Sequence, residues 1–240
     1  MRRFLVVPIV NTGDLDVIER QGERMADSFS VQKYWEEVNS RRRETAWLVD
    51  FYNKIRLGSP FSTAEEESRA NELFWIRRQV SRFNWRSVLD AGCGPGFWFQ
   101  LWKELELSAT GVDRAEAAIP KALQMAESIG SSFPVKQSIL SNLPFADRAF
   151  DVAVTVKVLI HTPVSDIIHT MSELGRVADN ICLLEARYLK NTNIAPHVFD
   201  HDFISIAESL GYEPLVEDHF SQRQVFLVFR TRQPGALAGC

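Results

Sequence analysis

A glycine-rich segment behind a short apolar run most constrains the fold of this chain. Residues 88–96 read VLDAGCGPG, and an apolar helical face that includes Phe97, Leu101 and Trp102 follows them. Glycines at alternate positions let the backbone approach a ligand where a Cβ would clash, and a helix N-terminus offers unpaired N–H groups. The segment therefore predicts a ligand-binding turn between a β-strand and an α-helix.

Short apolar runs alternate with amphipathic helical stripes from Ser87 onward. The runs are residues 88–89, 109–112, 133–135, 150–156, 181–185, 213–216 and 225–229. This alternation predicts a doubly wound, seven-stranded and mainly parallel sheet with helices on both faces. The last strand follows its predecessor after a short gap, so we expect it to be antiparallel. Thr162-Pro163 predicts a helix start, and Gly130 and Gly211 predict helix ends.

The first third of the chain has helical periodicity. One stripe has Ser30 as its predicted cap, a second stops at Gly58, and Thr63 and Glu66 fit a capping box that opens a third helix. The apolar positions of these stripes are Val31, Tyr34, Trp35 and Val38, then Trp47, Leu48, Phe51, Tyr52 and Ile55, then Leu73, Ile76, Val80 and Phe83. Residues 1–10 predict a strand or an ordered arm.

Charge and cysteine usage exclude several classes of function. The net charge is -4, with 15 basic and 13 acidic residues up to Arg86 and 12 and 18 after it. Neither part is basic enough for a phosphate-backbone binder, so we expect no nucleic-acid partner. Cys93, Cys182 and Cys240 have no CxxC spacing, which disfavours a disulfide framework or a zinc site. No stretch has the length of a membrane span, and we expect a protein of the cytoplasm.

The second predicted strand ends in Asp113, seventeen residues after Gly96. An acidic residue there can accept both hydroxyls of a ribose, which suits either a nicotinamide or an S-adenosylmethionine ligand. The spacing G-x-G-x-G, with Asp90 at the strand end, departs from the G-x-G-x-x-G that holds a pyrophosphate. Methionine has a carboxylate and an ammonium but no pyrophosphate. The departure favours a methionine-bearing ligand, whose ammonium Asp90 could receive directly or through water.

Four segments together resemble successive motifs of the class I, Rossmann-like S-adenosylmethionine-dependent methyltransferases of the small-molecule type. These are residues 88–96, 111–113, 143–151 and 158–161, and the likeness covers residues 87–185. It implies methyl transfer from S-adenosyl-L-methionine to an oxygen, nitrogen or carbon of a small organic acceptor. It also implies an N-terminal arm and helical lid over residues 1–86, compact with a catalytic domain over residues 87–240. The same motifs serve many acceptors, so they do not indicate which one is used.

The resemblance also implies a cofactor-binding set. Its members are Asp90, Gly92, Cys93, Gly94, Gly96, Asp113, Arg114, Ser138, Ile139, Leu140 and Lys157. The glycines would line the methionine and ribose portion, Asp113 would bind the ribose, and Arg114 would pack beside the adenine. The family commonly has an acidic residue four positions before its 143–151 motif, where this chain has Ser138-Ile139-Leu140. Adenine recognition would then rest on the backbone there, with help from Ser138.

Lys157, at the end of the fourth predicted strand, is a second departure from the family. It is close to the expected reacting centre, where its ammonium could repel a sulfonium or bind an acidic acceptor. A lysine there can also direct its ammonium outward into solvent, and we favour this third interpretation.

His161 is the candidate catalytic base, because it follows the fourth strand at the carboxyl edge where ligands bind in this architecture. Alternatively, it orders the turn before Thr162-Pro163. Tyr34, Trp35, His197 and His201 are candidates for the acceptor site. Tyr34 and Trp35 could equally belong to the core, since they lie on a helical stripe. A metal site at His197 and His201 is disfavoured, because Asp200 or Asp202 can cap the following helix instead.

Two other functional hypotheses come from different classes. A cofactor-binding regulatory or partner subunit without turnover is supported by Ile139 and Lys157, the two departures from the family. A nicotinamide oxidoreductase is disfavoured by the glycine spacing and by the 143–151 segment. The fourth strand lacks an N/D-P-P-Y segment, which argues against an enzyme that methylates the amino groups of adenine or cytosine.

Overall fold

A computed structural model describes residues 31–41, 45–186, 197–221 and 224–231. Three helices precede the sheet: α2 (Val31–Arg41), α3 (Thr45–Leu57) and α4 (Ala64–Phe83). The strands are β1 (Ser87–Ala91), β2 (Ser108–Asp113), β3 (Val135–Gln137), β4 (Phe150–Val156), β5 (Ala178–Ala186), β6 (Glu213–Ser221) and β7 (Gln224–Arg230). The other helices are α5 (Phe99–Glu104), α6 (Ile119–Ser128), α7 (Ile167–Val177) and α8 (Phe203–Ser209), with short 3-10 turns η1 (Glu116–Ala118) and η2 (Leu159–His161).

The sheet has seven strands in the order β3-β2-β1-β4-β5-β7-β6. β1 pairs in parallel with β2 and β4, and β7 runs antiparallel to both β5 and β6. The predicted doubly wound, mainly parallel sheet with an antiparallel last strand is therefore confirmed. The carboxyl ends of β1, β2 and β4 meet at one edge, where Asp90 aligns with Gly111 and Val154. Ligands of open α/β sheets bind at this kind of edge.

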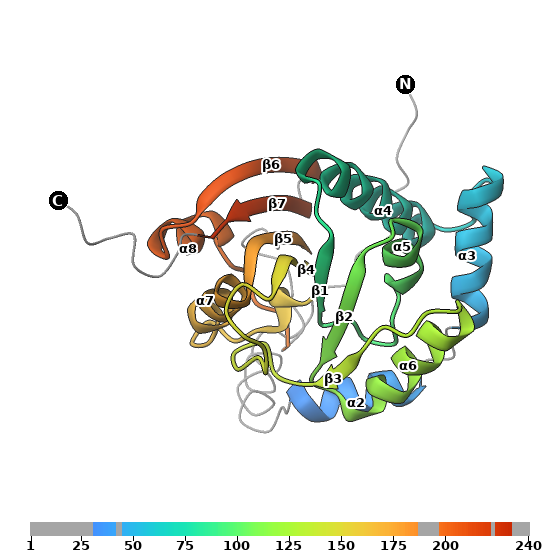
Figure 1. The fold of residues 1–240 in the computed structure, drawn as a ribbon, viewed down its shortest axis with the longest axis horizontal. Coiled ribbons are helices and arrows are strands. Elements are labelled where there is room, and N and C mark those ends of the chain that lie inside the picture. The colour runs from blue at the N-terminus through green and yellow to red at the C-terminus, as the bar shows by residue number, and fades with distance from the viewer. Residues whose placement is uncertain (1–30, 42–44, 187–196, 222–223, 232–240) are drawn as a thin grey trace, which may run out of the picture.

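The core forms two layers because side chains alternate along each strand. Val88 of β1 packs with buried side chains of α3, α4, α5 and α6, whereas Leu89 packs with those of α7 and α8. Figure 1 shows α3 to α6 to one side of the sheet, α7 and α8 to the other, and α2 below β2 and β3. Phe51 and Tyr52 of α3 belong to the first layer, so this helix shares the core of the sheet.

Several predicted helix ends are confirmed. Thr63 caps α4 by accepting a hydrogen bond from the Glu66 N–H (3.1 Å), and the Glu66 carboxylate accepts from the N–H of Ser62 (2.6 Å). Of the apolar residues predicted for the buried face of α4, Leu73, Ile76 and Val80 are buried and Phe83 is half-buried. Gly58, Gly130 and Gly211 all have left-handed backbones and each lies just after a helix.

The helix start predicted at Thr162-Pro163 is wrong. α7 begins at Ile167, after a turn in which the Asp166 N–H donates to the carbonyl of Pro163 (2.9 Å). The Thr162 carbonyl, which a helix starting there would use internally, is engaged by the His201 ring instead (2.9 Å). The segment is thus a turn packed against His201, and α7 begins about one turn later than predicted.

Some sequence-based expectations lie outside the described residues. These are the arm at residues 1–10, the helix cap at Ser30, and Cys240. The side chains of Val31, Trp47 and Leu48 are likewise not described. Within the described part of the chain, no helix is both long and apolar enough to cross a membrane.

Candidate functional site

The glycine turn after β1 is bound to the end of β2. The N–H groups of Gly92 and Cys93 both donate to the Val112 carbonyl, at 2.8 and 2.9 Å. The next glycine, Gly94, donates its N–H to Oδ2 of Asp113 at 2.8 Å. The turn and the acidic residue predicted to bind ribose therefore form one hydrogen-bonded unit.

The three glycines of this turn are required for different structural reasons. Gly92, Gly94 and Gly96 all have positive φ, at 82°, 52° and 85°. A Cβ on Gly92 would lie 2.6 Å from the Val158 side chain, and one on Gly96 would lie 2.9 Å from that of Phe99. A Cβ on Gly94 would have nothing within 4 Å. Gly94 therefore presents bare backbone to open space, as a close ligand approach requires.

Asp113 has a carboxylate shared between two backbone donors. Its Oδ1 accepts from the Ala115 N–H and its Oδ2 from the Gly94 N–H, both at 2.8 Å. Burial raises the pKa of Asp113, and the hydrogen bonds from Ala115 and Gly94 oppose the rise. Each carboxylate oxygen has two lone pairs, so the group can still accept further hydroxyl donors.

Asp90 lies at the inner side of the same turn. Its Oδ2 accepts from the indole N–H of Trp102 at 2.8 Å, and its side chain is buried. Burial raises the pKa of Asp90 to about 7, because desolvation disfavours the charged form. Cys93, also in the cofactor set, is buried and donates to the Gly94 carbonyl at 3.6 Å, and burial raises its thiol pKa well above the ordinary value. The Cys93 side chain therefore packs inside the turn, and any contact of Cys93 with a cofactor would come from its backbone.

The residues predicted to surround an adenine lie along the end of β3. The Ser138 N–H donates to the Asp113 carbonyl at 2.9 Å, and the Ser138 hydroxyl donates to the carbonyls of Ile139 (3.2 Å) and Asn142 (2.9 Å). Ile139 is 48% exposed, an unusual exposure for a large apolar side chain at this edge. Leu140 and Arg114 are half-buried, and burial lowers the Arg114 pKa. Ser138 thus contacts Asp113 directly, Arg114 follows Asp113 in the chain, and Ile139 and Leu140 continue from Ser138.

Lys157 does not direct its ammonium into solvent, which corrects the interpretation favoured from the sequence. Its Nζ lies 2.6 Å from Oε1 of Glu72, a residue of α4 that is only 1% exposed. The Lys157 backbone is left-handed, with φ at 56°, and its N–H donates to the Leu184 carbonyl. The buried carboxylate holds the ammonium because an unpaired buried charge is costly.

His161 stands at the end of η2, directly after β4. The turn is held from below by Glu185 of β5, whose carboxylate accepts from the N–H groups of Val158, Leu159 and Ile160 at 3.2, 3.2 and 3.5 Å. Glu185 also accepts from the Thr155 hydroxyl at 2.8 Å. Burial raises the pKa of Glu185 to about 7, against the effect of these hydrogen bonds. Glu185 thus anchors the turn that leads from β4 to His161.

The hydrogen bond of the His161 ring determines which nitrogen is available for chemistry. Nδ1 lies 2.9 Å from the His197 carbonyl, which can only accept, so we assign the proton to Nδ1 and the free lone pair to Nε2. Burial lowers the pKa of His161 to about 4, which keeps the ring neutral near pH 7. The ring is therefore a hydrogen-bond acceptor and a weak base.

Aromatic side chains of α2 cover this histidine. Trp35 packs its ring edge to face with His161 (4.8 Å between centroids), and Tyr34 stacks on His197 (4.2 Å). Glu36 of the same helix accepts from the N–H groups of Glu116 and Ala117 in η1, at 2.6 and 2.9 Å. Tyr34, Trp35 and His197 are thus brought together with His161, while Glu36 ties their helix to the turn after β2.

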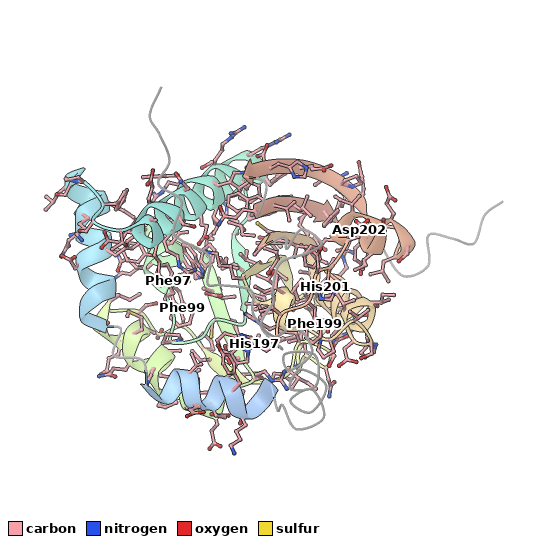
Figure 2. All side chains as sticks on the ribbon, turned by 180° about the vertical axis from the view of Figure 1, so that it is seen from behind. Phe97, Phe99, His197, Phe199, His201 and Asp202 are labelled. Atoms are coloured by element: carbon pink, nitrogen blue, oxygen red, sulfur yellow. The ribbon has the colours of Figure 1, made fainter. Side chains whose placement is uncertain are left out.

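The second histidine of the 197–202 segment has a different place. Figure 2 shows His197 beside α2, whereas His201 and Asp202 lie toward α8. His201 is buried, and its Nε2 contacts the Thr162 carbonyl at 2.9 Å. Asp202 caps α8 by accepting from the Ser205 N–H at 3.1 Å, as one of the two predicted alternatives. His197 and His201 do not converge, and no metal-binding group of histidine, cysteine and acidic residues occurs among the described residues.

Sequence reasoning missed the acidic residues that organise this edge. Glu185 carries a local signal, since it interrupts an apolar run at the end of β5. Glu36 and Glu72 carry none, because each lies on a helix with other charged residues and acquires its role only through tertiary contact. Trp102 was assigned to the core of α5, and its bond to Asp90 is a further role that its spacing does not indicate.

Comparisons with known proteins bear on the central part of the chain. A family model described as a methyltransferase domain matches residues 88–180. An uncharacterized methyltransferase of Schizosaccharomyces pombe is 29% identical over 129 residues, which cover 49% of this chain and 45% of that protein. This chain therefore matches less than half the length of that relative.

Solved structures share the fold at low sequence identity. Magnesium protoporphyrin IX methyltransferase from Synechocystis, with bound S-adenosylmethionine, has a TM-score of 0.60 at 18% identity over 85% of this chain and 98% of that one. A protein from Pyrococcus horikoshii has a TM-score of 0.59 at 18% identity over 71% and 93%. The [4+2]-cyclase SpnF has a TM-score of 0.54 at 15% identity over 61% and 74%. The same fold thus accompanies more than one activity.

Proposed function

We propose that this chain, which carries a class I S-adenosylmethionine-dependent methyltransferase domain, transfers a methyl group from S-adenosylmethionine to a small organic acceptor. The accepting atom would be an oxygen, nitrogen or carbon. The observation that supports this most directly is the pairing of the open-faced Gly94 with the Asp113 carboxylate. Together they offer bare backbone and a hydroxyl acceptor at the carboxyl edge of the sheet, where such a ligand is expected.

The residues present fit the cofactor. Asp113 would accept the ribose hydroxyls, Gly94 would adjoin the methionine portion, and Asp90 would receive the ammonium. The exposed side chain of Ile139, with Leu140 and Arg114, would cover the adenine. When bound, the cofactor supplies a methyl group already activated on its sulfonium. The protein then has mainly to align the acceptor and exclude water, and alignment accounts for much of the rate of such a reaction.

His161 would orient the acceptor from the side of the site opposite the cofactor. Its Nε2 lone pair can accept a hydrogen bond from a hydroxyl or amine, and Trp35 and Tyr34 would form an aromatic wall around it. An aromatic face is also attractive to a sulfonium through cation–π contact. His197 shapes this wall by stacking on Tyr34, whereas His201 supports the turn behind it.

One titration series tests the proposal. S-adenosylmethionine and S-adenosylhomocysteine should bind in a calorimeter, and NAD should not. A screen of small hydroxyl, amine and carbon-acid acceptors would then follow turnover by release of S-adenosylhomocysteine. NAD binding without either adenosyl ligand would contradict the proposal. Tight adenosyl-ligand binding with no turnover on any acceptor would favour a regulatory subunit instead.

Asp113→Ala should weaken S-adenosylhomocysteine binding by ~1–3 kcal/mol, because it removes a charged acceptor from hydroxyl donors in a buried site. Calorimetric titration of the variant measures the loss. Asp50→Ala is the matched control, since Asp50 is an exposed aspartate on α3. Unchanged affinity in a folded Asp113→Ala protein would remove this residue from the proposed site.

We propose that a lid (residues 1–86) lies over a catalytic domain (residues 87–240), and that α2 is the part of the lid that responds to ligand binding. This helix docks on η1 through Glu36, and η1 follows Asp113 closely. Segments that move on ligand binding come from the less stable parts of a structure. α3 and α4 contribute Phe51, Tyr52 and Leu73 to the core, so they should stay in place.

Hydrogen exchange should therefore distinguish α2 from α3. Amides of residues 31–41 should gain protection when S-adenosylhomocysteine binds, while those around Phe51 and Tyr52 should be protected throughout. Glu36→Gln should reduce the gain in α2, because a neutral amide is a weaker acceptor for the η1 N–H groups. Glu37→Gln, at an exposed position of the same helix, is the control. High protection of α2 without ligand would make it fixed core.

A further inference from the structure

Two cationic side chains lie near the glycine turn. Arg69 has no role in the function proposed so far, and Lys157 has one only as a member of the cofactor-binding set that the family resemblance implies. The Arg69 guanidinium of α4 lies 4.8 Å from the ring centroid of Phe97 and 6.0 Å from that of Trp98, the residues that follow Gly96. Lys157 is next in the chain to Val158, whose side chain would lie 2.6 Å from a Cβ on Gly92. Figure 2 labels Phe97 at the end of this turn. Arg69 therefore contacts the residues that follow the turn, and Lys157 is one residue from a contact of the turn.

These two cations share a single carboxylate. Glu72 receives the Lys157 ammonium at Oε1 (2.6 Å) and the Arg69 Nη1 at Oε2 (3.3 Å). Its other polar neighbour is a donor, the Ser68 hydroxyl at 3.3 Å, which itself accepts from the Gln224 amide. The group of Arg69, Glu72 and Lys157 thus carries one positive charge in excess. It is also accessible, with the Arg69 and Lys157 side chains 18% and 30% exposed and Glu72 buried beneath them.

Two features indicate that this group is built for a ligand. The Nε of Arg69 is buried and has no hydrogen-bond partner among the described residues. Buried donors are almost always satisfied, so this Nε is a donor that an acceptor such as a carboxylate would satisfy. Lys157 holds a left-handed backbone that is costly for a residue with a Cβ, and such strain concentrates at functional sites.

We propose that Arg69 and Lys157 form a carboxylate-binding site beside the glycine turn. The planar guanidinium can bind a carboxylate through paired N–H groups, and the lysine adds a point charge. The inference rests on the proposed function, which brings two possible carboxylates to this edge: that of the cofactor's methionine and one on an acidic acceptor. The position favours the methionine carboxylate, because Arg69 contacts the residues after Gly96 and neither cation contacts the His161 ring in the described contacts.

Decarboxylated S-adenosylmethionine tests the first source, because it keeps the sulfonium, the ammonium and the adenosine. By calorimetry, the unmodified protein should bind S-adenosylmethionine about ten- to a hundredfold more tightly than the decarboxylated form, as expected for a charge-assisted hydrogen bond. Arg69→Gln should bring this ratio close to one, and Arg69→Lys should restore part of it. Arg78→Gln, at an exposed position of α4, should leave the ratio unchanged.

The second source is tested with S-adenosylhomocysteine bound. If the site serves an acidic acceptor, benzoate should bind more tightly than benzamide, and Arg69→Gln should remove the difference. The Glu72→Gln/Lys157→Met double variant probes the lysine in both arms without leaving a buried carboxylate unpaired. A discrimination that these variants abolish in either arm supports the site and identifies its ligand.

Equal affinities in both arms would overturn the carboxylate site. So would variants that lower only the melting temperature, because the group would then be structural. A change in the affinity of S-adenosylmethionine relative to S-adenosylhomocysteine, with the carboxylate ratios intact, would show that Lys157 acts on the sulfonium and not on an anion. If the unmodified protein binds neither S-adenosylmethionine nor its decarboxylated form, the proposed function itself fails. Cofactor binding without carboxylate discrimination defeats only this inference.

Discussion

Gly94→Val should abolish S-adenosylhomocysteine binding while leaving most of the fold intact. A Cβ at Gly94 meets nothing within 4 Å, so the protein leaves open space where a side chain would begin. The branched side chain of valine would fill the space where the cofactor must approach the backbone. The residue also has φ at 52°, a conformation that β-branched side chains rarely adopt. Rearrangement of the turn would pull the Gly94 N–H away from Asp113 as well.

Gly58→Val separates the two causes of this loss. Gly58 has φ at 64° and also has nothing within 4 Å of its Cβ position, but it lies after α3, away from the glycine turn. The control therefore carries the same kind of backbone strain without obstructing the proposed ligand. Circular dichroism should show folded protein for both variants, and calorimetry should show binding only for Gly58→Val. Normal cofactor binding by Gly94→Val would refute the role proposed for the glycine turn.

The parts of this structure that the sequence predicts are those encoded locally. The strands of the sheet follow from apolar runs, and the turn after β1 follows from its closely spaced glycines. These glycines have the positive φ that glycine adopts readily. Thr63 and Glu66 specify the start of α4 within four residues of chain. The position of Asp113 against Gly94 was also predictable, because parallel neighbouring strands bring their carboxyl ends together.

The failures share one physical cause, which is that tertiary contacts override local preference. Thr162-Pro163 has the pattern of a helix start, yet the segment is a turn whose Thr162 carbonyl contacts the His201 ring. Lys157 has the pattern of a solvated side chain, yet a buried carboxylate from a helix far away in the chain captures it. No spacing rule links Lys157 to Glu72, since their contact depends on how α4 lies across the sheet.

The titration of His161 could not be predicted from the sequence either. An unperturbed histidine has a pKa near 6.5, which suggests a base that titrates close to neutrality. Burial by Trp35 and the surrounding turn instead lowers the His161 pKa to about 4. The neutral ring is then the form present at all physiological pH values, and only strong acid removes its Nε2 lone pair. Activity that depends on the neutral His161 ring should therefore fall as the pH drops toward 4, and it should not change with His161 titration at higher pH.

His161→Ala should lower kcat about a hundredfold, at the low end of what a positioned acid–base group contributes, with little effect on S-adenosylhomocysteine affinity. The low pKa makes the ring a weak base, so its main contribution is to orient the acceptor.

His161→Asn separates the role of a cavity wall from that of a hydrogen-bond partner, because its amide can still donate to the His197 carbonyl but offers no Nε2 lone pair. Activity retained in the asparagine variant would make His161 a wall, and activity lost would make it the acceptor's hydrogen-bond partner. His169→Ala, an exposed histidine on α7, is the control. The pH profile of the unmodified protein should show no histidine limb around neutrality, and a fully active His161→Ala protein would exclude the residue from the reaction.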